Sequence, residues 1–441
     1  MSEIVEQVRA AGVVGAGGAG FPTHIKLQAQ AEIYIVNGAE CEPMLKTDQQ
    51  LVQREAEKLV KGLAAAMQAT GANAGIIALK AKYKESIAKL TPLLQANMRI
   101  GILPDIYPAG DEVITIWLLT GRRVPPGGLP IDIGVVVNNV QTLINLADAL
   151  EGKPVITRTL TVTGAVKFPK TVTVPIGVTL QGVLDLAGGP LGSGVAYLEG
   201  GPMMGKLVAD LNKPVTKITG GLIALPADHP LILKRQMSLQ AVLRIAQTVC
   251  EQCCYCTDLC PRHLIGHELP PHLIIRAVSY NRLGDPQVLN SALTCSECGV
   301  CEAYACPVGI SPMRVNRALK AELRSKGVKY GGQLGAEQSM AKSRLIPSSR
   351  LVARLGIKPW YVEAPFKDVS FEAQQVHILL TQHIGAPAIP VVQKGDSVTA
   401  GQLLGEIPEG KLGARVHASI AGTVVNVTGQ GILIQKGGRH V

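Results

Sequence analysis

The chain has 441 residues, enough for two to four domains, and 47% of them are hydrophobic while only 17% are charged, which excludes a disordered chain. Lys and Arg exceed Asp and Glu by 43 to 33, a formal net charge of +10, but aromatic residues reach only 3%, so platforms for stacking bases are scarce and nucleic-acid binding is not expected. No apolar run is long enough to span a membrane, and the N-terminus carries early acidic residues. We therefore expect a cytoplasmic protein without a transmembrane segment.

A glycine loop lies near the N-terminus. Apolar residues at helical spacing predict a helix over residues 4–8, and Gly15, Gly17 and Gly20 then satisfy the pattern GxGxxG. The dinucleotide fingerprint needs a strand before this loop, so a preceding helix argues against the usual nucleotide fold. The loop amides can still approach a phosphate or a ring face, although a plain glycine turn fits the loop equally well. Thr23 is expected to cap a short helix after the loop.

The following residues alternate between strands and helices, which predicts an α/β domain. Strands are expected at residues 33–36, 74–82 and 135–137, and helices at 48–69 and from 84 onward. Polar residues follow the strands or begin helices at Asn37, Glu40, Glu42, Gly110, Asp111, Glu112, Asn138, Asn139 and Thr142. Ligands gather at the carboxyl ends of parallel strands, and these side chains suit ribose and ribityl hydroxyls.

Eight of the ten cysteines form two tight runs. The first reads CxxCxxCxxxCP and the second CxxCxxCxxxxCP, both typical of ferredoxins. In two-cluster ferredoxins the last cysteine of each run binds the other cluster. We therefore assign one [4Fe-4S] cluster to Cys250, Cys253, Cys256 and Cys306, and the second to Cys295, Cys298, Cys301 and Cys260.

Zinc and disulfides are the competing interpretations of these cysteines. Structural zinc usually uses two CxxC pairs separated by a longer loop, and disulfides need an export route. Cys254 has no role in the spacing and is expected to be a bystander, and Cys41 a small buried residue. His263 and His267 could share a helix face, but Pro271 interrupts a zinc-protease HExxH motif, so a structural role is favoured.

The remaining segments predict further modules. Residues 157–205 suggest a hairpin and a short helix, residues 230–325 are expected to be helical, and residues 375–436 contain short β runs. The C-terminal region lacks a MetLysMet motif, so a swinging lipoyl or biotinyl arm is not expected. A solvated basic face, or alternatively a docking patch for an acidic partner, is expected at Arg314, Arg317, Lys320, Arg324, Lys326 and Lys329.

Four motifs in order carry a family resemblance. VGAGGAGFPTHIK, YIVNGAECEP, YPAGDE and VVVNNVQTL resemble the flavin- and NADH-binding motifs of the complex I 51 kDa subunit family. The wider layout resembles the Rnf complex C subunits and, more closely, the cobalamin reductases of propanediol-utilising bacterial microcompartments. In the Rnf proteins the barrel-like module precedes the flavin domain, whereas here it comes last.

This resemblance implies a multidomain α/β architecture. The expected units are an FMN- and NADH-binding domain (1–152), a β-grasp module of the soluble-ligand-binding type (153–228), a two-cluster ferredoxin-type helical domain (229–330), a linker (331–374) and a barrel-sandwich module (375–441). We expect the β-grasp module to act as a structural spacer.

The resemblance also implies roles for individual residues. The FMN phosphate and ring would be held by Gly15, Gly17, Gly18 and Lys26, and the pocket completed by Asn37, Glu40, Tyr107, Gly110, Asp111, Asn138, Asn139 and Thr142. Phe21 and Glu42 would face the nicotinamide nucleotide, and Glu112, between nucleotide and flavin, is the catalytic candidate. Ala16 and Ala39 depart from the family, replacing an arginine and an acidic residue.

The implied function is NADH-dependent reduction of cobalamin through FMN and two [4Fe-4S] clusters, in the cytoplasm and within a bacterial microcompartment. Implied partners are cobalamin or a cobalamin-handling adenosyltransferase, together with a shell protein. Two alternatives stay open: an Rnf-type input subunit that feeds ferredoxin or a membrane ion pump, and a non-catalytic relay or scaffold.

Overall fold

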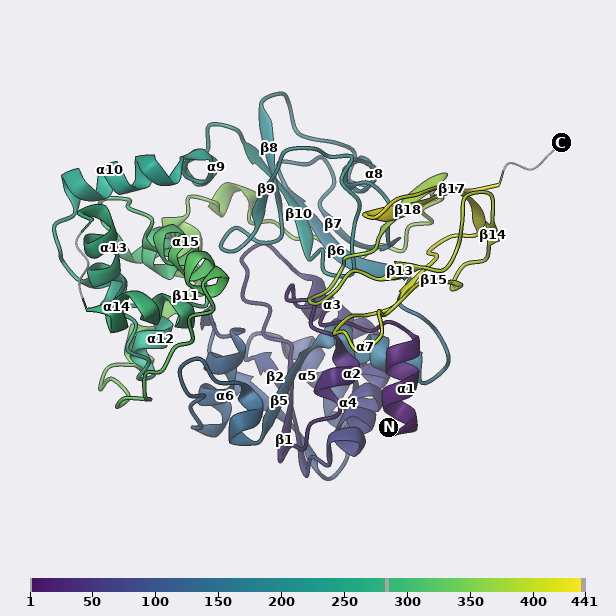
Figure 1. Cartoon of the computed structure of the whole chain (residues 1–441), viewed down its shortest axis with the longest axis horizontal. Coiled ribbons are helices and arrows are strands. Elements are labelled where there is room, and N and C mark those ends of the chain that lie inside the picture. The colour runs from purple at the N-terminus through teal and green to yellow at the C-terminus, as the bar shows by residue number, and fades with distance from the viewer. Residues whose placement is uncertain (1, 282–284, 438–441) are drawn as a thin grey trace.

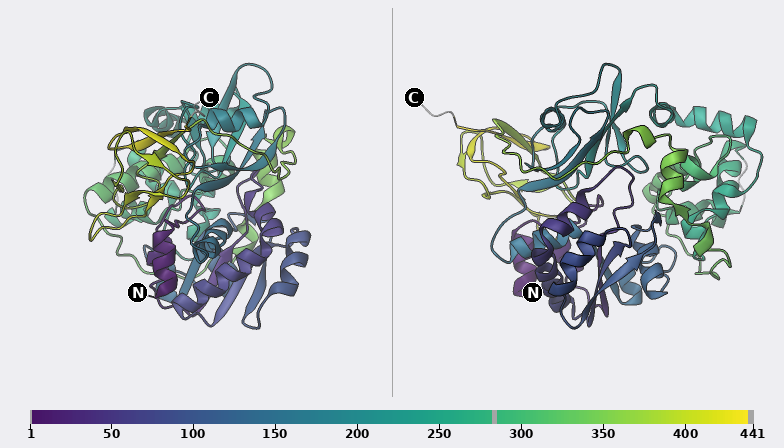
Figure 2. Two further views of the ribbon diagram at one scale, coloured as in Figure 1. Left: turned by 90° about the vertical axis from the view of Figure 1, so that its right-hand side faces the viewer. Right: turned by 180° about the vertical axis from the view of Figure 1, so that it is seen from behind.

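The computed structural model describes residues 2–281 and 285–437. An N-terminal α/β domain lies at the bottom of Figure 1, with a mixed sheet above it, a helical lobe on one side and the C-terminal strands on the other. The view from behind shows the same separation of the helical lobe from the C-terminal strands (Figure 2, right). The N-terminal domain and the mixed sheet therefore form the centre of the molecule.

The N-terminal domain is built on a parallel sheet of strand order β3-β2-β1-β5. Its strands are β1 (Ile33–Asn37), β2 (Ala74–Lys80), β3 (Met98–Leu103) and β5 (Val135–Asn139). Apolar residues of successive strand positions enter two different cores, one under α4 (Ala56–Thr70) and α7 (Val140–Ala149), the other under α6 (Glu112–Thr120). Coverage on both faces explains the near-continuous apolar strands. The domain also contains α1 (Glu3–Ala10), α2 (Thr23–Lys26), α5 (Lys84–Leu90), η1 (Thr91–Leu93), β4 (Ile106–Tyr107) and η2 (Pro130–Ile133).

Two local predictions in this domain are wrong. The helix expected over residues 48–69 is two helices, α3 (Thr47–Arg54) and α4, separated by the non-helical Glu55. The packing of α4 on α7 is so close that a Cβ at Gly62 would clash with the Leu143 carbonyl oxygen, whereas α3 contacts α5. Thr23 does not cap α2, because it is the first helical residue and its amide donates to the Val13 carbonyl oxygen at 3.1 Å.

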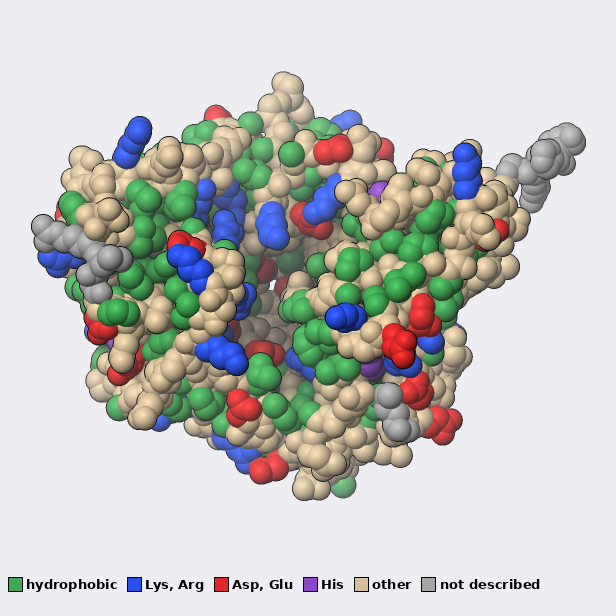
Figure 3. Space-filling view, viewed as in Figure 1, with side chains coloured by type: hydrophobic (Ala, Val, Ile, Leu, Met, Phe, Trp, Pro, Cys, Tyr) green, Lys and Arg blue, Asp and Glu red, His purple; other side chains and the backbone are tan. Residues whose placement is uncertain are grey.

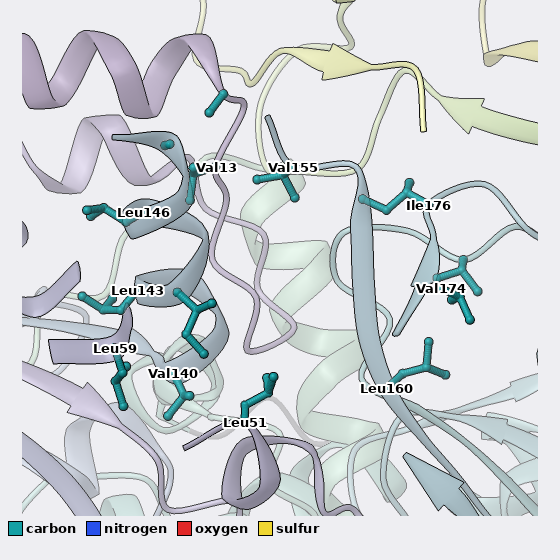
Figure 4. Close-up of a cluster of buried hydrophobic side chains, with 14 of the residues drawn as sticks. Val13, Leu51, Leu59, Val140, Leu143, Leu146, Val155, Leu160, Val174 and Ile176 are labelled. Atoms are coloured by element: carbon teal, nitrogen blue, oxygen red, sulfur yellow. The ribbon is translucent and has the colours of Figure 1, made fainter. Parts of the chain in front are cut away.

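The second module is a mixed five-stranded sheet of order β7-β6-β10-β8-β9. The predicted hairpin and short helix are present. The elements are β6 (Thr157–Gly164), β7 (Lys170–Pro175), α8 (Leu180–Leu186), β8 (Val195–Glu199), β9 (Lys206–Val208) and β10 (Gly221–Pro226). Leu160 and Val174 share one apolar core with Leu51 and Val140 of the N-terminal domain (Figure 4). The two modules therefore pack as one body.

The described part of residues 230–325 is mainly helical, as predicted. The helices are α9 (Pro230–Gln236), α10 (Leu239–Val249), α11 (Tyr255–Asp258), α12 (Pro261–Leu264), α13 (Pro271–Ser279), α14 (Pro286–Asn290), η3 (Ser291–Thr294), the π-helical turn η4 (Cys301–Ala305) and α15 (Pro312–Ser325). Helix α12 ends before His267, so His263 and His267 do not share a helix face. The His267 ring nitrogen Nε2 lies 2.9 Å from the Val124 carbonyl oxygen, consistent with the favoured structural role.

The basic stretch is only partly a solvated face. Arg314 donates to the Lys234 carbonyl oxygen at 3.3 Å, and Lys320 donates to the Cys295 carbonyl oxygen at 2.6 Å. These two side chains hold the helical lobe together.

The last third of the chain returns to the other modules. Residues 331–374, expected to be a linker, contain η5 (Lys342–Arg344), β11 (Ile346–Pro347), α16 (Ser348–Arg354) and η6 (Lys358–Trp360), and β11 pairs with β4 of the N-terminal domain. The C-terminal module has two sheets, β12-β18-β17-β14 and β13-β15-β16. Its strands are β12 (Gln375–Leu379), β13 (Ile389–Pro390), β14 (Ser397–Val398), β15 (Leu403–Glu406), β16 (Val416–His417), β17 (Gly422–Val427) and β18 (Gly431–Gln435).

Three modules meet at a buried lysine. Lys217 donates to the Gly12 carbonyl oxygen at 2.6 Å and to the Arg415 carbonyl oxygen at 2.7 Å. His417 is buried at the same junction, and burial together with the Lys217 and Arg415 charges lowers its pKa to about 3, with an opposing contribution from Glu406. His417 is therefore neutral in the folded protein.

We predict that this junction weakens in mild acid. The unfolded chain takes up a proton at His417 near pH 6.5 while the folded chain does not, so the free energy of unfolding should fall by about 2 kcal/mol between pH 6.5 and 5. Melting temperatures measured from pH 7.5 to 5 should decrease less in His417→Gln than in the unaltered protein. Equal decreases in the two proteins would contradict a buried neutral His417.

Candidate functional site

The glycine loop closes on itself and leaves its tip open. The Gly15 amide donates to the Phe21 carbonyl oxygen at 2.8 Å, and the Gly20 amide donates to the Gly15 carbonyl oxygen at 3.1 Å. The tip, Gly17 to Ala19, is exposed, and the described residues provide no hydrogen-bond partner for its three amides. Gly18 has φ +104°, a conformation that favours glycine, with open space where a Cβ would lie. Successive free amides of this kind suit an anion such as a phosphate.

The loop contacts the start of α7, and Lys26 of α2 contacts β5 and the start of α6. The Ala16 amide donates to Thr142 Oγ1 at 2.9 Å. Lys26 Nζ donates to the Val137 carbonyl oxygen at 2.9 Å and lies 3.6 Å from the Glu112 carboxylate. The fold therefore brings together the glycine loop, Lys26, Glu112 and Thr142, as the sequence predicted.

The end of β1 joins the same region. Asn37 Nδ2 donates to the Gly110 carbonyl oxygen at 2.7 Å. An added Cβ at Gly110 would lie 3.0 Å from Cys41 Sγ, so this position favours glycine. Cys41 is partly buried there and packs against the apolar cluster that includes Met44 and Tyr107.

The two asparagines that end β5 hold neighbouring side chains. Asn138 Nδ2 donates to the Tyr34 hydroxyl at 2.6 Å, and Asn139 Nδ2 donates to Asp48 Oδ2 at 2.7 Å. Burial raises the pKa of Asp48 and of Glu40, and the Asp48 charge raises that of Glu40 further. These carboxyl groups form a partly buried acidic pair at the ends of β1 and β5, and the Asp48 amide donates to Glu40 Oε2 at 3.3 Å.

Glu42 turns toward the second module. Its carboxylate accepts hydrogen bonds from the Met203 amide at 2.9 Å and the Met204 amide at 2.7 Å. Burial raises its pKa to about 7, and these two amides oppose the increase. Phe21 lies in the glycine loop, and the described residues show no hydrogen bond or ring contact between it and Glu42. The structure thus engages Glu42 with the loop over residues 200–205.

The eight cysteines of the two runs line two separate cavities. The first cavity contains Cys250, Cys253, Cys256 and Cys306, with Cys254 also in its lining, and the second contains Cys260, Cys295, Cys298 and Cys301. Each cavity therefore takes three cysteines from one run and the last cysteine of the other, which is the division that the spacing suggested. No group of three or more His, Cys, Asp or Glu side chains in the described residues is arranged to hold a single metal ion.

The two cysteine runs share a backbone pattern. Gln252 and Cys254 have positive φ in the first run, and Glu297 and Gly299 have positive φ at the matching positions of the second. Cys254 therefore stands where the other run has glycine, and it adopts a conformation that costs a non-glycine residue about 1 kcal/mol or more. A backbone that alternates between negative and positive φ in this way points its amide groups into a concave site.

The cavities differ in exposure. Cys253 in the first cavity is exposed, whereas all four cysteines of the second are buried. Burial raises the pKa of Cys256 and Cys260 to about 12, so bound iron would have to displace protons from these thiols. The first cavity faces solvent and the second faces the protein interior.

Two contacts link the second cavity to the N-terminal domain. The Tyr107 hydroxyl donates to the Cys298 carbonyl oxygen at 2.6 Å. Arg262 Nη2 donates to Asp111 Oδ2 at 2.9 Å, while Asp111 Oδ1 caps the start of α6. Figure 3 shows a hollow in the middle of this face, with acidic and basic side chains around it, between the helical lobe and the C-terminal strands.

Sequence reasoning missed three buried or nearly buried polar residues near these sites. Arg158 in β6 donates from Nη2 to the Ala16 carbonyl oxygen at 2.8 Å, and its Nη1 has no partner in the described residues. Arg262 and Asn316 line the second cysteine cavity. Arg158 could have been noticed in the sequence, because its charge stands at a strand position that the alternating pattern predicts to face inward. The sequence around Arg262 and Asn316 contains no pattern that predicts a role for either residue.

Comparison with known proteins gives each part of the chain a family. The Nuo51 FMN-binding domain matches residues 8–148, the SLBB domain residues 159–207, the 4Fe-4S dicluster domain residues 249–311, and the RnfC barrel sandwich hybrid domain residues 362–439. An FMN-binding domain joined to a 4Fe-4S domain defines an electron-transfer flavin and iron–sulfur oxidoreductase.

Full-length relatives specify the family further. The chain is 58% identical to the cobalamin reductase PduS of Citrobacter freundii over 98% of this chain and 96% of that protein, and 58% identical to the cobalamin reductase PduS of Salmonella typhimurium over 99% and 97%. It belongs to the PduS cobalamin reductase family. A component of the Na(+)-translocating ferredoxin:NAD(+) oxidoreductase complex of Acetobacterium woodii is 38% identical over 59% of this chain and 58% of its own length. An NAD+-reducing [NiFe]-hydrogenase structure aligns with 73% of this chain and 62% of its own at 25% identity, with a TM-score of 0.48.

The Glu42 contact can be tested by hydrogen exchange. Glu42→Ala should speed exchange at the Met203 and Met204 amides roughly 30- to 150-fold, because two hydrogen bonds to a carboxylate, worth about 2–3 kcal/mol together, are lost. Glu40→Ala removes a neighbouring carboxylate that does not contact these amides and should leave them unchanged. Unaltered exchange in Glu42→Ala would show that the carboxylate does not hold this loop.

Proposed function

We propose that the protein is an NADH-dependent cobalamin reductase that uses FMN and two [4Fe-4S] clusters and works inside a bacterial microcompartment. The observation that carries the proposal is the pair of cysteine cavities, the second of which is hydrogen-bonded to the FMN-binding domain through Tyr107. The substrate rests on the 58% identity to two cobalamin reductases over nearly the whole chain.

The glycine loop and the strand ends fit a flavin mononucleotide. The free amides of residues 17–19 and the Lys26 ammonium would hold its phosphate, supported by Gly15, Gly17 and Gly18. The ring and ribityl chain would be met by Asn37, Glu40, Tyr107, Gly110, Asp111, Asn138, Asn139 and Thr142. When bound, FMN accepts a hydride and releases its electrons one at a time. Arg158 supplies a buried cation to the loop in which Ala16 replaces the family arginine.

The proposed NADH site is supported by where its candidate residues lie and not by an open pocket. Glu112 begins α6 and lies 3.6 Å from Lys26, so it stands at the mouth of the proposed flavin site as the catalytic candidate. Phe21 and Glu42 would contact the nicotinamide nucleotide, and Glu42 would have to leave the Met203 and Met204 amides to do so. Binding of NADH would thus compete with the contact to the 200–205 loop.

The two cysteine sets would hold the clusters in an inner and an outer position. Cys260, Cys295, Cys298 and Cys301 lie beside the FMN-binding domain, and Cys250, Cys253, Cys256 and Cys306 open to solvent. This order supports delivery of single electrons from the interior to the surface. No helix among the described residues has both the length and the apolar character needed to cross a membrane.

The alternatives have less support. The Rnf-type relatives match only part of the chain, 59% of it for the A. woodii protein, and the barrel-sandwich module occupies residues 362–439 at the C-terminus. An adenosyltransferase that receives the reduced corrin and a shell protein are the partners that the proposal includes. A relay without NADH oxidation is separated from the reductase by the experiment below.

The decisive assay uses anaerobic, iron-reconstituted full-length protein with FMN, NADH and cob(III)alamin. NADH should bleach the flavin and then reduce the corrin, both followed by absorbance. Flavin bleaching without corrin reduction would overturn cobalamin as the acceptor. Absence of flavin bleaching would overturn NADH oxidation and favour the relay.

The crossed cysteine sets make a sharp prediction about iron content. Cys260→Ser and Cys298→Ser should each lose about four of eight irons and the same paramagnetic signal, although they lie in different runs, and Cys306→Ser should match Cys253→Ser. Iron analysis and electron paramagnetic resonance after dithionite reduction measure this.

Cys254→Gly is the matched control. It removes a thiol from the same loop but relieves the positive φ at that position, so it should keep all the iron. If Cys260→Ser instead lost the signal that Cys253→Ser loses, the crossed assignment would be wrong.

A further inference from the structure

Two polar side chains with unpaired hydrogen-bond donors line the second cysteine cavity. Arg262 and Asn316 border the space enclosed by Cys260, Cys295, Cys298 and Cys301. Within residues 2–281 and 285–437, Arg262 Nε and Nη1 and Asn316 Nδ2 are buried donors without a nitrogen or oxygen partner. Burial raises the pKa of the Cys295 thiol, and hydrogen bonding from the Asn316 side chain opposes this rise, so Asn316 already lies at a sulfur atom of the cavity. An unpaired buried donor costs about 1–3 kcal/mol, so three such donors at one cavity call for acceptors that the cavity would hold.

Both side chains are fixed in position by the surrounding structure. Arg262 follows Cys260 and Pro261, and its third nitrogen is held by Asp111 at 2.9 Å, with both side chains nearly buried. Asn316 is 1% exposed and lies in α15, one turn before Lys320, which binds the Cys295 carbonyl oxygen. The two donors therefore reach the cavity from different elements.

The first cavity lacks an equivalent pair. Its remaining lining includes Ile275, Val308, Ile310 and His272, with no arginine among the described residues. Its one carboxamide in the described residues, Gln252, is exposed, and its Oε1 accepts from Arg276 Nη1 at 3.0 Å. The His272 ring nitrogen Nδ1 is already paired with Thr257 Oγ1 at 2.7 Å. The two cavities thus differ in the number of free donors as well as in exposure.

We propose that Arg262 and Asn316 donate hydrogen bonds to the sulfur atoms of the cluster in the second cavity and raise its reduction potential. This inference rests on the proposed function for the presence of that cluster. On reduction the cluster gains one electron, from the flavin in the proposed reaction or from dithionite in the test, and one unit of negative charge. Hydrogen-bond donors and a nearby cation stabilise the reduced, more negative form of the cluster. Hydrogen bonds to the sulfur atoms therefore raise the reduction potential of iron–sulfur clusters.

The position of Arg262 also connects the cluster cavity with the proposed flavin site. Asp111 binds Arg262 and caps α6, the helix that begins with Glu112. The guanidinium is thus a positioning group shared by the proposed flavin site and the cluster cavity. Replacement of Arg262 should therefore change the potential of the inner cluster more than that of the outer one.

The test is a redox titration of the anaerobic, reconstituted full-length protein, monitored by electron paramagnetic resonance. Asn316→Leu and Arg262→Met should each shift one cluster signal to a more negative potential and leave the other within the error of the unaltered protein. Arg262→Lys should restore part of the shift, because it keeps the charge. Arg324→Gln, which removes an exposed cation from the last turn of the same α15, should shift neither signal.

Each outcome is decisive. Unchanged potentials in variants that keep their iron, or equal shifts of both signals, would overturn the proposal. If Arg262→Met loses iron, Asn316→Leu decides, and loss of iron from both variants would assign these residues a structural role instead. Absence of cluster signals in the unaltered protein would reject the proposed function itself.

Discussion

Two polar contacts between the N-terminal domain and the helical lobe fix the position of the inner cysteine cavity. Tyr107 binds the Cys298 carbonyl oxygen, and Asp111 binds Arg262. Both contacts are largely buried, where a satisfied hydrogen bond or ion pair is stronger than in water and a broken one is costly. Tyr107 and Asp111 belong to one short motif, so the segment expected to line the flavin pocket also positions the cysteines.

The second module does more than separate its neighbours. Its loop over residues 200–205 presents amides to Glu42 on one side, and Arg235 of the helical lobe donates to the Pro202 and Met203 carbonyl oxygens at 2.8 Å on the other. The Met203 carbonyl oxygen also lies within 3.4 Å of the position that a Cβ at Gly299 would take. The sequence favoured a structural spacer. In the structure this module contacts both the flavin-type domain and the loops that carry the cysteines.

The parts that the sequence predicted well are those set by local spacing. The crossed division of the cysteines follows from two short patterns, and the parallel strands follow from continuous apolar runs buried on both faces. The break between α3 and α4 at Glu55 was missed because the apolar spacing continues through it and no glycine or proline marks the position. The partner of Glu42 and the contact of Arg158 with the glycine loop were missed because each contact joins residues more than 140 positions apart.

The unequal exposure of the two cysteine sets determines how the protein would age in air. Cys253 is open to solvent, so dissolved oxygen and chelators would directly reach iron held by the outer set in the proposed protein, while the inner set is screened by its neighbours. Damage would therefore begin at the surface and spare the centre next to the flavin-type domain. A partly degraded sample would still accept electrons at the proposed flavin and inner cluster, but it could no longer pass them on through the outer cluster.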